Sequence, residues 1–139
     1  MAWFVLGAWV IQACVGVVLL VGWLRHSGVP GAGARGRAAV LAHLLLSLVA
    51  LGLWVAFVLT HRILLGWVSL GGLTVGNALG DLLLVRRSRR ASGNGLSWRA
   101  DYGTAIRNVF TGRFPRRVAF HALFAGVVYF GALAACLMT

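Results

Sequence analysis

The stretch GGLTVGNALGD, residues 71–81, decides the fold of this chain. It lies inside a long apolar run, 63–85, which is followed at once by the arginine-rich stretch 86–90. Three of its glycines recur every four residues: Gly72, Gly76 and Gly80. In a helix they form one smooth stripe, against which a second membrane helix can pack closely. Asn77 and Asp81 each follow a stripe glycine by one residue and lie on the neighbouring face. We expect this packing surface at the centre of a membrane protein.

The composition supports a membrane class. Of the 139 residues, 60% are hydrophobic and only 11% are charged, whereas globular proteins carry about 25% charged residues. Four apolar runs occur, at about 2–24, 38–60, 63–85 and 117–138. Each is long enough for a helix to cross a hydrocarbon core of about 30 Å, and none alternates with the period of a strand. We predict an all-α polytopic membrane protein, a single domain over 1–139 with four transmembrane helices in an up-down bundle.

The distribution of arginine predicts the orientation. All 13 basic residues are arginine, and Arg62 alone lies outside the stretches 25–37 and 86–117. Cytoplasmic loops carry the excess of positive charge. The loops 25–37 and 86–116 are therefore expected in the cytoplasm and both termini outside the cell membrane. Beside membrane spans, the net charge of +11 favours anionic lipid headgroups as a partner rather than nucleic acid.

The segment 97–111 predicts a short cytoplasmic helix in the membrane interface. It follows a glycine-containing break at 92–95, and Ser97 can cap it. One stripe at helical spacing is apolar: Trp98, Tyr102, Ile106, Val109 and Phe110. Arg99 and Arg107 lie off that stripe. An amphipathic helix of this kind lies on the bilayer with its aromatic residues towards the acyl chains. A disordered basic loop is the alternative, because Gly103 and Gly112 weaken the helix.

Three polar residues share one layer of the predicted bundle. His43, Asp81 and His121 each lie four or five residues inside the cytoplasmic end of a different span. At about 1.5 Å per residue, each lies roughly 6–8 Å below that surface. Ionisable groups at such depth are costly and mark functional sites. This layer is the candidate site of the chain.

Three functions fit the layer. His43 and His121 can be the two axial ligands of a haem b in an electron-transfer protein, with Asp81 fixing one imidazole as an outer partner. The same three residues, His43, His121 and Asp81, can instead hold a transition metal, or Asp81 can serve a small proton-coupled transporter. In the third interpretation, which we favour, the polar groups hold helices together. The protein is then an assembly or interaction subunit, with other membrane subunits or further copies of itself as partners.

The remaining polar residues limit the classes of function that the sequence favours. Gln12 is expected to hydrogen-bond a neighbouring helix, and Cys14 and Cys136 both fall within spans, which argues against a disulfide framework. The sequence has no paired carboxylates and no phosphate-binding loop. Whether the chain is an enzyme stays open, and a non-enzymatic role is favoured. We expect the first run to be retained as a span rather than cleaved as a signal peptide.

Overall fold

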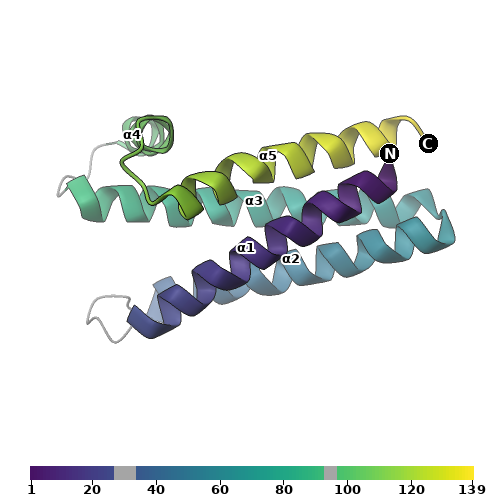
Figure 1. Cartoon of the computed structure of the whole chain (residues 1–139), viewed down its shortest axis with the longest axis horizontal. Helices are drawn as coiled ribbons and strands as arrows, with labels where there is room; N and C mark the ends of the chain where they lie inside the picture. Colours follow the sequence, from purple (N-terminus) through teal and green to yellow (C-terminus); the bar gives the residue numbers. More distant parts are fainter. Residues whose placement is uncertain (27–33, 93–96) are drawn as a thin grey trace.

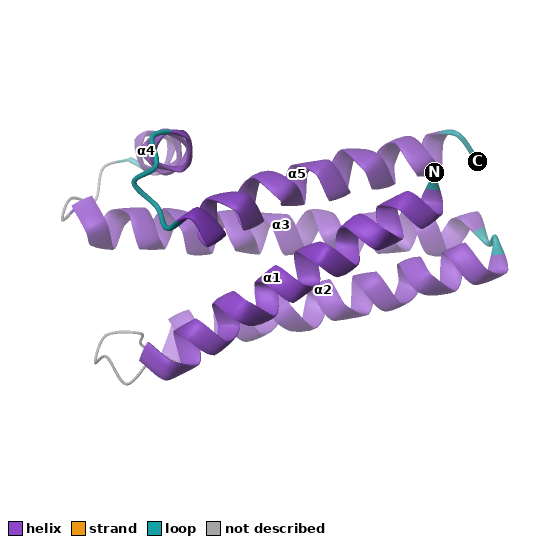
Figure 2. Cartoon of the chain, in the orientation of Figure 1, coloured by secondary structure: helices purple, strands orange, loops and turns teal. Residues whose placement is uncertain are grey.

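The computed structural model describes residues 1–26, 34–92 and 97–139. Within them every regular element is a helix, as Figure 2 shows. The five helices are α1 (Ala2–His26), α2 (Ala34–Thr60), α3 (Ile63–Ser92), α4 (Trp98–Phe110) and α5 (Arg116–Leu137). Much of the loop expected at 25–37 and most of the break expected at 92–95 fall outside the described residues. The all-helical prediction is confirmed for the described part of the chain.

Four helices are long and apolar enough to cross a membrane: α1, α2, α3 and α5. Their number agrees with the predicted number of spans. Helix α3 continues seven residues beyond Val85, the predicted end of the third span, to Ser92. Arginine is a good helix former, and cations in a last turn interact favourably with the helix dipole. The arginine cluster therefore prolongs the helix after the apolar run has ended.

The four long helices lie side by side along the long axis of the molecule (Figure 1). Both termini lie at one end, and α4 crosses the other end at a steep angle to its neighbours. We call the end that holds α4 and the stretch 86–90 the arginine-rich end. Helix α3 makes its largest contact with α2, and α1 makes its largest with α5. In Figure 1, α1 and α5 lie close near the termini and diverge towards the arginine-rich end.

The main core lies nearer the termini. Trp54 is fully buried at its centre, with its ring 6.0 Å from that of Trp9 and 5.1 Å from that of Phe57. Such aromatic contacts add to the gain from burying the rings. The indole Nε1 of Trp54 donates a hydrogen bond to the Ala2 carbonyl, which ties α2 to the start of α1. This end of the molecule is therefore closed by large side chains.

The glycine stripe of α3 lies against α2. A Cβ at Gly72 would lie 3.1 Å from Cβ of Ala50, and one at Gly76 would lie 3.6 Å from Oγ of Ser47. A Cβ at Gly80 would lie 3.3 Å from Cε1 of His43. The missing side chains therefore let α2 and α3 approach closely over three turns. Asn77, on the neighbouring face, is half-buried.

The link between α2 and α3 is very short. Only His61 and Arg62 separate the two helices. His61 has a φ of 55°, in the left-handed backbone region that residues other than glycine seldom adopt. Its backbone N–H donates a hydrogen bond of 2.8 Å to the Phe57 carbonyl and so closes the end of α2. This turn makes α2 and α3 antiparallel neighbours.

Gly72→Leu should destabilise the protein, because its side chain would meet Ala50 of α2. Overpacking of this kind costs about 1–3 kcal/mol, and thermal unfolding in detergent would measure it as a lower Tm. Gly52→Leu is the matched control, since Gly52 is exposed on α2 and has open space around it. Equal melting of the two variants would contradict close packing at the stripe.

Candidate functional site

His43 is held on α2 by a backbone group of α3. Its Nδ1 lies 2.8 Å from the carbonyl oxygen of Gly76. A carbonyl oxygen only accepts, so Nδ1 carries the hydrogen in this contact. In the neutral ring, Nε2 then has a free lone pair. Because Gly76 lacks a side chain, its backbone can come close enough for this bond. His43 is thus oriented as metal-binding histidines commonly are.

His121 on α5 packs against α1. The side-chain Nε2 of Gln12 donates a hydrogen bond of 2.8 Å to the backbone carbonyl of His121, which confirms the predicted interhelical role of Gln12. A Cβ at Gly16 would lie only 3.3 Å from Cε1 of the His121 ring. The ring nitrogen Nδ1 of His121 is buried and has no hydrogen-bond partner among the described residues. A buried polar atom without a partner is costly and calls for an explanation.

The two imidazoles lie next to each other. Their ring centroids are 6.4 Å apart and their planes are inclined at 81°. The predicted layer therefore brings His43 of α2 and His121 of α5 together in space. Two neutral imidazoles in this arrangement can pass a proton between them or donate nitrogen lone pairs to one metal ion.

Asp81 does not join the histidines. Its Oδ2 instead accepts a hydrogen bond of 3.2 Å from the hydroxyl of Tyr102 on α4. One residue along a helix is a rotation of about 100°, so Asp81 points away from α2 while Gly80 faces it. The described residues hold no group of three His, Cys, Asp or Glu side chains able to bind a metal ion. The predicted set of His43, His121 and Asp81 is therefore not assembled, and the expected contact between Asp81 and an imidazole is replaced by one with Tyr102.

The other acid fastens α4 to α3. Asp101 is buried, and its Oδ2 accepts a hydrogen bond of 2.6 Å from Nε of Arg89. Asn108 donates a hydrogen bond of 3.0 Å from its Nδ2 to Oγ of Ser88. An apolar cluster surrounds these contacts: Leu84, Val85, Ala105, Val109 and Phe114. This joint was not predicted from the sequence, although a lone acid in a basic segment was the available signal. Ser97 caps α4, as predicted, by accepting a hydrogen bond from the Ala100 N–H.

The predicted lipid-facing residues of α4 lie mostly on its outer side. Trp98, Tyr102 and Phe110 are 50%, 37% and 71% exposed. Ile106 is half-buried, and Arg99 and Arg107 are exposed. Val109, placed on the same stripe from sequence, is instead buried against α3. The helix turns a partly polar face inward because Asp101 and Asn108 find partners there, and leaves aromatic rings outside.

No protein-family model, curated protein or solved structure matches this chain at a significant level. The features of the molecule that bear on its function are therefore the imidazole pair, the α3–α4 joint and the exposed faces of the helices.

Asp81→Asn should lower the pKa of Tyr102. Burial raises that pKa most, and the negative charge of Asp81 and the hydrogen bond to it raise it further. Removing the charge should move the pKa back towards the usual value of about 10. Ultraviolet absorbance of tyrosinate, followed in a Tyr129→Phe background, measures the shift. An unchanged pKa would show that the two side chains are apart.

The same contact has a pH dependence. Because the pKa of Tyr102 is raised in the folded protein, the protonated hydroxyl stabilises the docked α4 below a pH of about 10. That contribution should be lost as the pH rises through the folded-state pKa. Proteolysis between α3 and α4 at increasing pH would report the loosening, and Asp81→Asn should reduce its pH dependence.

Proposed function

We propose that this chain is a small integral membrane protein that acts as an assembly or interaction subunit of a membrane complex. In this proposal α1, α2, α3 and α5 form an up-down bundle across the cell membrane. The arginine-rich end faces the cytoplasm and both termini lie outside. The four apolar helices and the concentration of arginine near one end support this arrangement through the positive-inside rule.

We place α4 in the cytoplasmic interface. It lies across the ends of its neighbours rather than along them (Figure 1). Its outer side combines the exposed aromatic rings of Trp98, Tyr102 and Phe110 with the exposed guanidinium groups of Arg99 and Arg107. Interfacial helices use this combination, with aromatics at the acyl boundary and cations at anionic headgroups.

The observation that carries the assembly proposal is a second small-residue face on α3. While the glycine stripe packs on α2, the residues Gly71, Val75 and Ala78 are exposed on the outer side, and Thr74, also exposed, lies at the edge of this face, 3.5 Å from the Tyr129 hydroxyl of α5. They recur at helical spacing, and Gly71 has nothing within 4 Å of the place of its missing side chain. The hydroxyl of Thr74 already donates to the Leu70 carbonyl at 2.8 Å. A partner helix can therefore approach this face closely without leaving a polar group unpaired.

Photo-crosslinking tests the partner face. Benzoylphenylalanine at position 75 should give a light-dependent covalent adduct with a membrane protein or a second copy of this chain in native membranes. Position 49 on α2 is the matched control, since Val75 and Val49 are 55% and 59% exposed in the middle of their helices. We expect no adduct from position 49.

Glycine variants sharpen that experiment. Gly71→Leu should remove the adduct formed from position 75, because the leucine would hold the partner helix away. Gly52→Leu, at another exposed glycine with open space around it, should leave the adduct intact. Reaction with lipid alone from position 75, or indifference to Gly71→Leu, would sink the assembly proposal at this face.

The imidazole pair supports a second candidate function, electron transfer through one haem b. Iron–nitrogen bonds of about 2 Å place two axial nitrogens about 4 Å apart, and ring centroids 6.4 Å apart are compatible with that spacing. His43 also has the outer hydrogen bond, to Gly76, that leaves Nε2 available. His43 and His121 would hold the haem, and the haem would supply reversible one-electron chemistry.

The absorption spectrum of the purified protein tests this second candidate. A haem protein should show a Soret band and sharp visible bands on reduction. His43→Ala or His121→Ala should each abolish them. His61→Ala is the control, because His61 is exposed at the turn between α2 and α3. Protein that stays colourless after growth and reconstitution with haem would rule out the electron-transfer role.

A further inference from the structure

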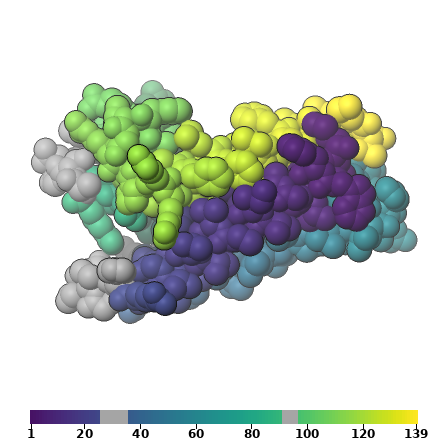
Figure 3. Space-filling model, viewed as in Figure 1, coloured from purple at the N-terminus to yellow at the C-terminus, as the bar shows by residue number. Residues whose placement is uncertain are grey.

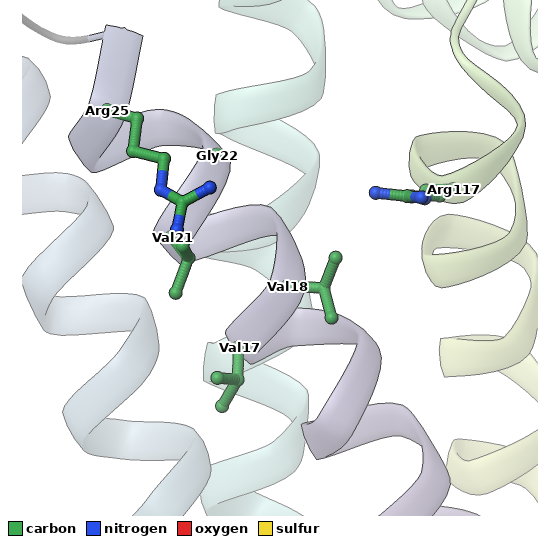
Figure 4. Close-up of a pocket in the computed structure, with 6 residues that line it drawn as sticks. All are labelled: Val17, Val18, Val21, Gly22, Arg25 and Arg117. Carbon is green, nitrogen blue, oxygen red and sulfur yellow. The ribbon is translucent and has the colours of Figure 1, made fainter.

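A cavity of about 370 Å³ lies between α1 and α5 towards the arginine-rich end. Its lining is apolar on α1 and positively charged on both sides: Val17, Val18, Val21, Gly22, Arg25 and Arg117. Figure 4 shows the guanidinium group of Arg117 directed from α5 towards α1, while that of Arg25 folds back along α1. The cavity occurs where the two helices diverge, so it opens between helices rather than within the main core.

A separate, apolar groove lies between the same two helices, nearer the start of α1. Its volume is about 450 Å³, and it is lined by Phe4, Gly7, Ala8, Ile11 and Phe124. On α1 the groove residues Phe4, Gly7 and Ile11 and the cavity residues Val18, Val21 and Arg25 each follow one another at three or four positions, and Ile11 and Val18 are seven positions apart, so the two sets share one face. Cys14, which is exposed, lies between Ile11 and Val18 on that face. Figure 3 views the molecule from a side on which α1 and α5 are both at the surface.

The dimensions of this face match one leaflet of a bilayer. Ten residues separate Val21 from Ile11, a rise of about 15 Å at about 1.5 Å per residue. Half of a hydrocarbon core of about 30 Å has the same depth. Arg25 lies one turn beyond Val21, at the level expected for a phosphate group. The charged and apolar parts of the face are thus ordered as in a phospholipid molecule.

We propose that the cleft between α1 and α5 binds one anionic phospholipid. Arg25 and Arg117 contact its phosphate, and one acyl chain lies along Val21, Val18 and Val17 towards Ile11. This site is separate from the proposed partner face on α3 and from the aromatic side of α4. It concerns a single bound lipid rather than general attraction to the membrane surface.

Electrostatics favours an anion in this cleft. Guanidinium groups bind phosphate oxygens through paired hydrogen bonds. The chain has two acidic side chains, and both are engaged at the α3–α4 joint, Asp81 with Tyr102 and Asp101 with Arg89. No carboxylate lines the cleft, so a ligand can supply the countercharge. Arg117 also lies in the first turn of α5, whose N-cap Pro115 offers no side-chain cap, and a helix N-terminus attracts negative charge.

Native mass spectrometry of the whole protein in detergent tests the site. With phosphatidylglycerol we expect one tightly bound lipid, and with phosphatidylcholine a much weaker adduct. The variant Arg25→Ala/Arg117→Ala should weaken phosphatidylglycerol binding at least tenfold. Arg87→Ala/Arg113→Ala is the matched control, because it removes two exposed arginines near the same end and should bind as the parent does.

A second variant tests whether the shape of the cavity contributes to lipid binding independently of its two arginines. Gly22 lines the cavity, and a Cβ there meets nothing within 4 Å. Gly22→Leu should therefore fold, fill the cavity and reduce phosphatidylglycerol binding with both arginines present. Equal binding by the Arg25/Arg117 variant and the parent would overturn the proposal, as would equal loss in the control pair. Displacement of phosphatidylglycerol by inorganic phosphate would identify a site for free anions instead.

Discussion

The close approach of α2 and α3 is the constraint on which the rest of the structure depends. Without side chains at Gly72, Gly76 and Gly80, the two backbones approach near enough for His43 to hydrogen-bond a main-chain carbonyl of its neighbour. The same packing decides what α3 presents elsewhere. Once its glycine stripe faces α2, helical geometry turns Asp81 towards α4 and Gly71 outward. The contact between α2 and α3 thus positions the imidazole of His43 and leaves the face of α3 that contains Gly71 exposed.

The arginine-rich end contains few acidic side chains, and their positions determine which arginines are paired. Two carboxylates serve 13 arginines, and both are used where α4 meets α3. Burying an unpaired carboxylate is energetically unfavourable. Asp101 is stabilised by its ion pair with Arg89, a residue that remains partly exposed. Among the described residues, neither acid pairs with an arginine of α1 or α5. In the proposed orientation, lipid phosphate is the anion that a membrane would supply at that level.

Periodicity and composition were enough to predict the four spans, the cap at Ser97 and a common depth for His43 and His121. Depth along a helix follows from counting residues, whereas direction around it depends on which neighbour each face meets. That is why the sequence did not predict that Asp81 contacts Tyr102, or that Val109 packs inward. The joint between Arg89 and Asp101 was missed for a related reason, because its partners lie 12 residues apart on different helices.

The His121 imidazole and the cleft between α1 and α5 lie against neighbouring turns of the same two helices. Arg117 precedes His121 by one helical turn on α5. On α1, Gly16, where a Cβ would lie 3.3 Å from the His121 ring, precedes the cleft residue Val17. A ligand in the cleft would therefore hold α1 and α5 at a fixed separation just beside His121. If a change at the imidazoles requires a different distance between α1 and α5, the protein would then bind the cleft ligand with a different affinity. Linkage makes such an effect reciprocal, so the occupant of the cleft and the protonation or ligation of the histidines would influence each other to the same extent.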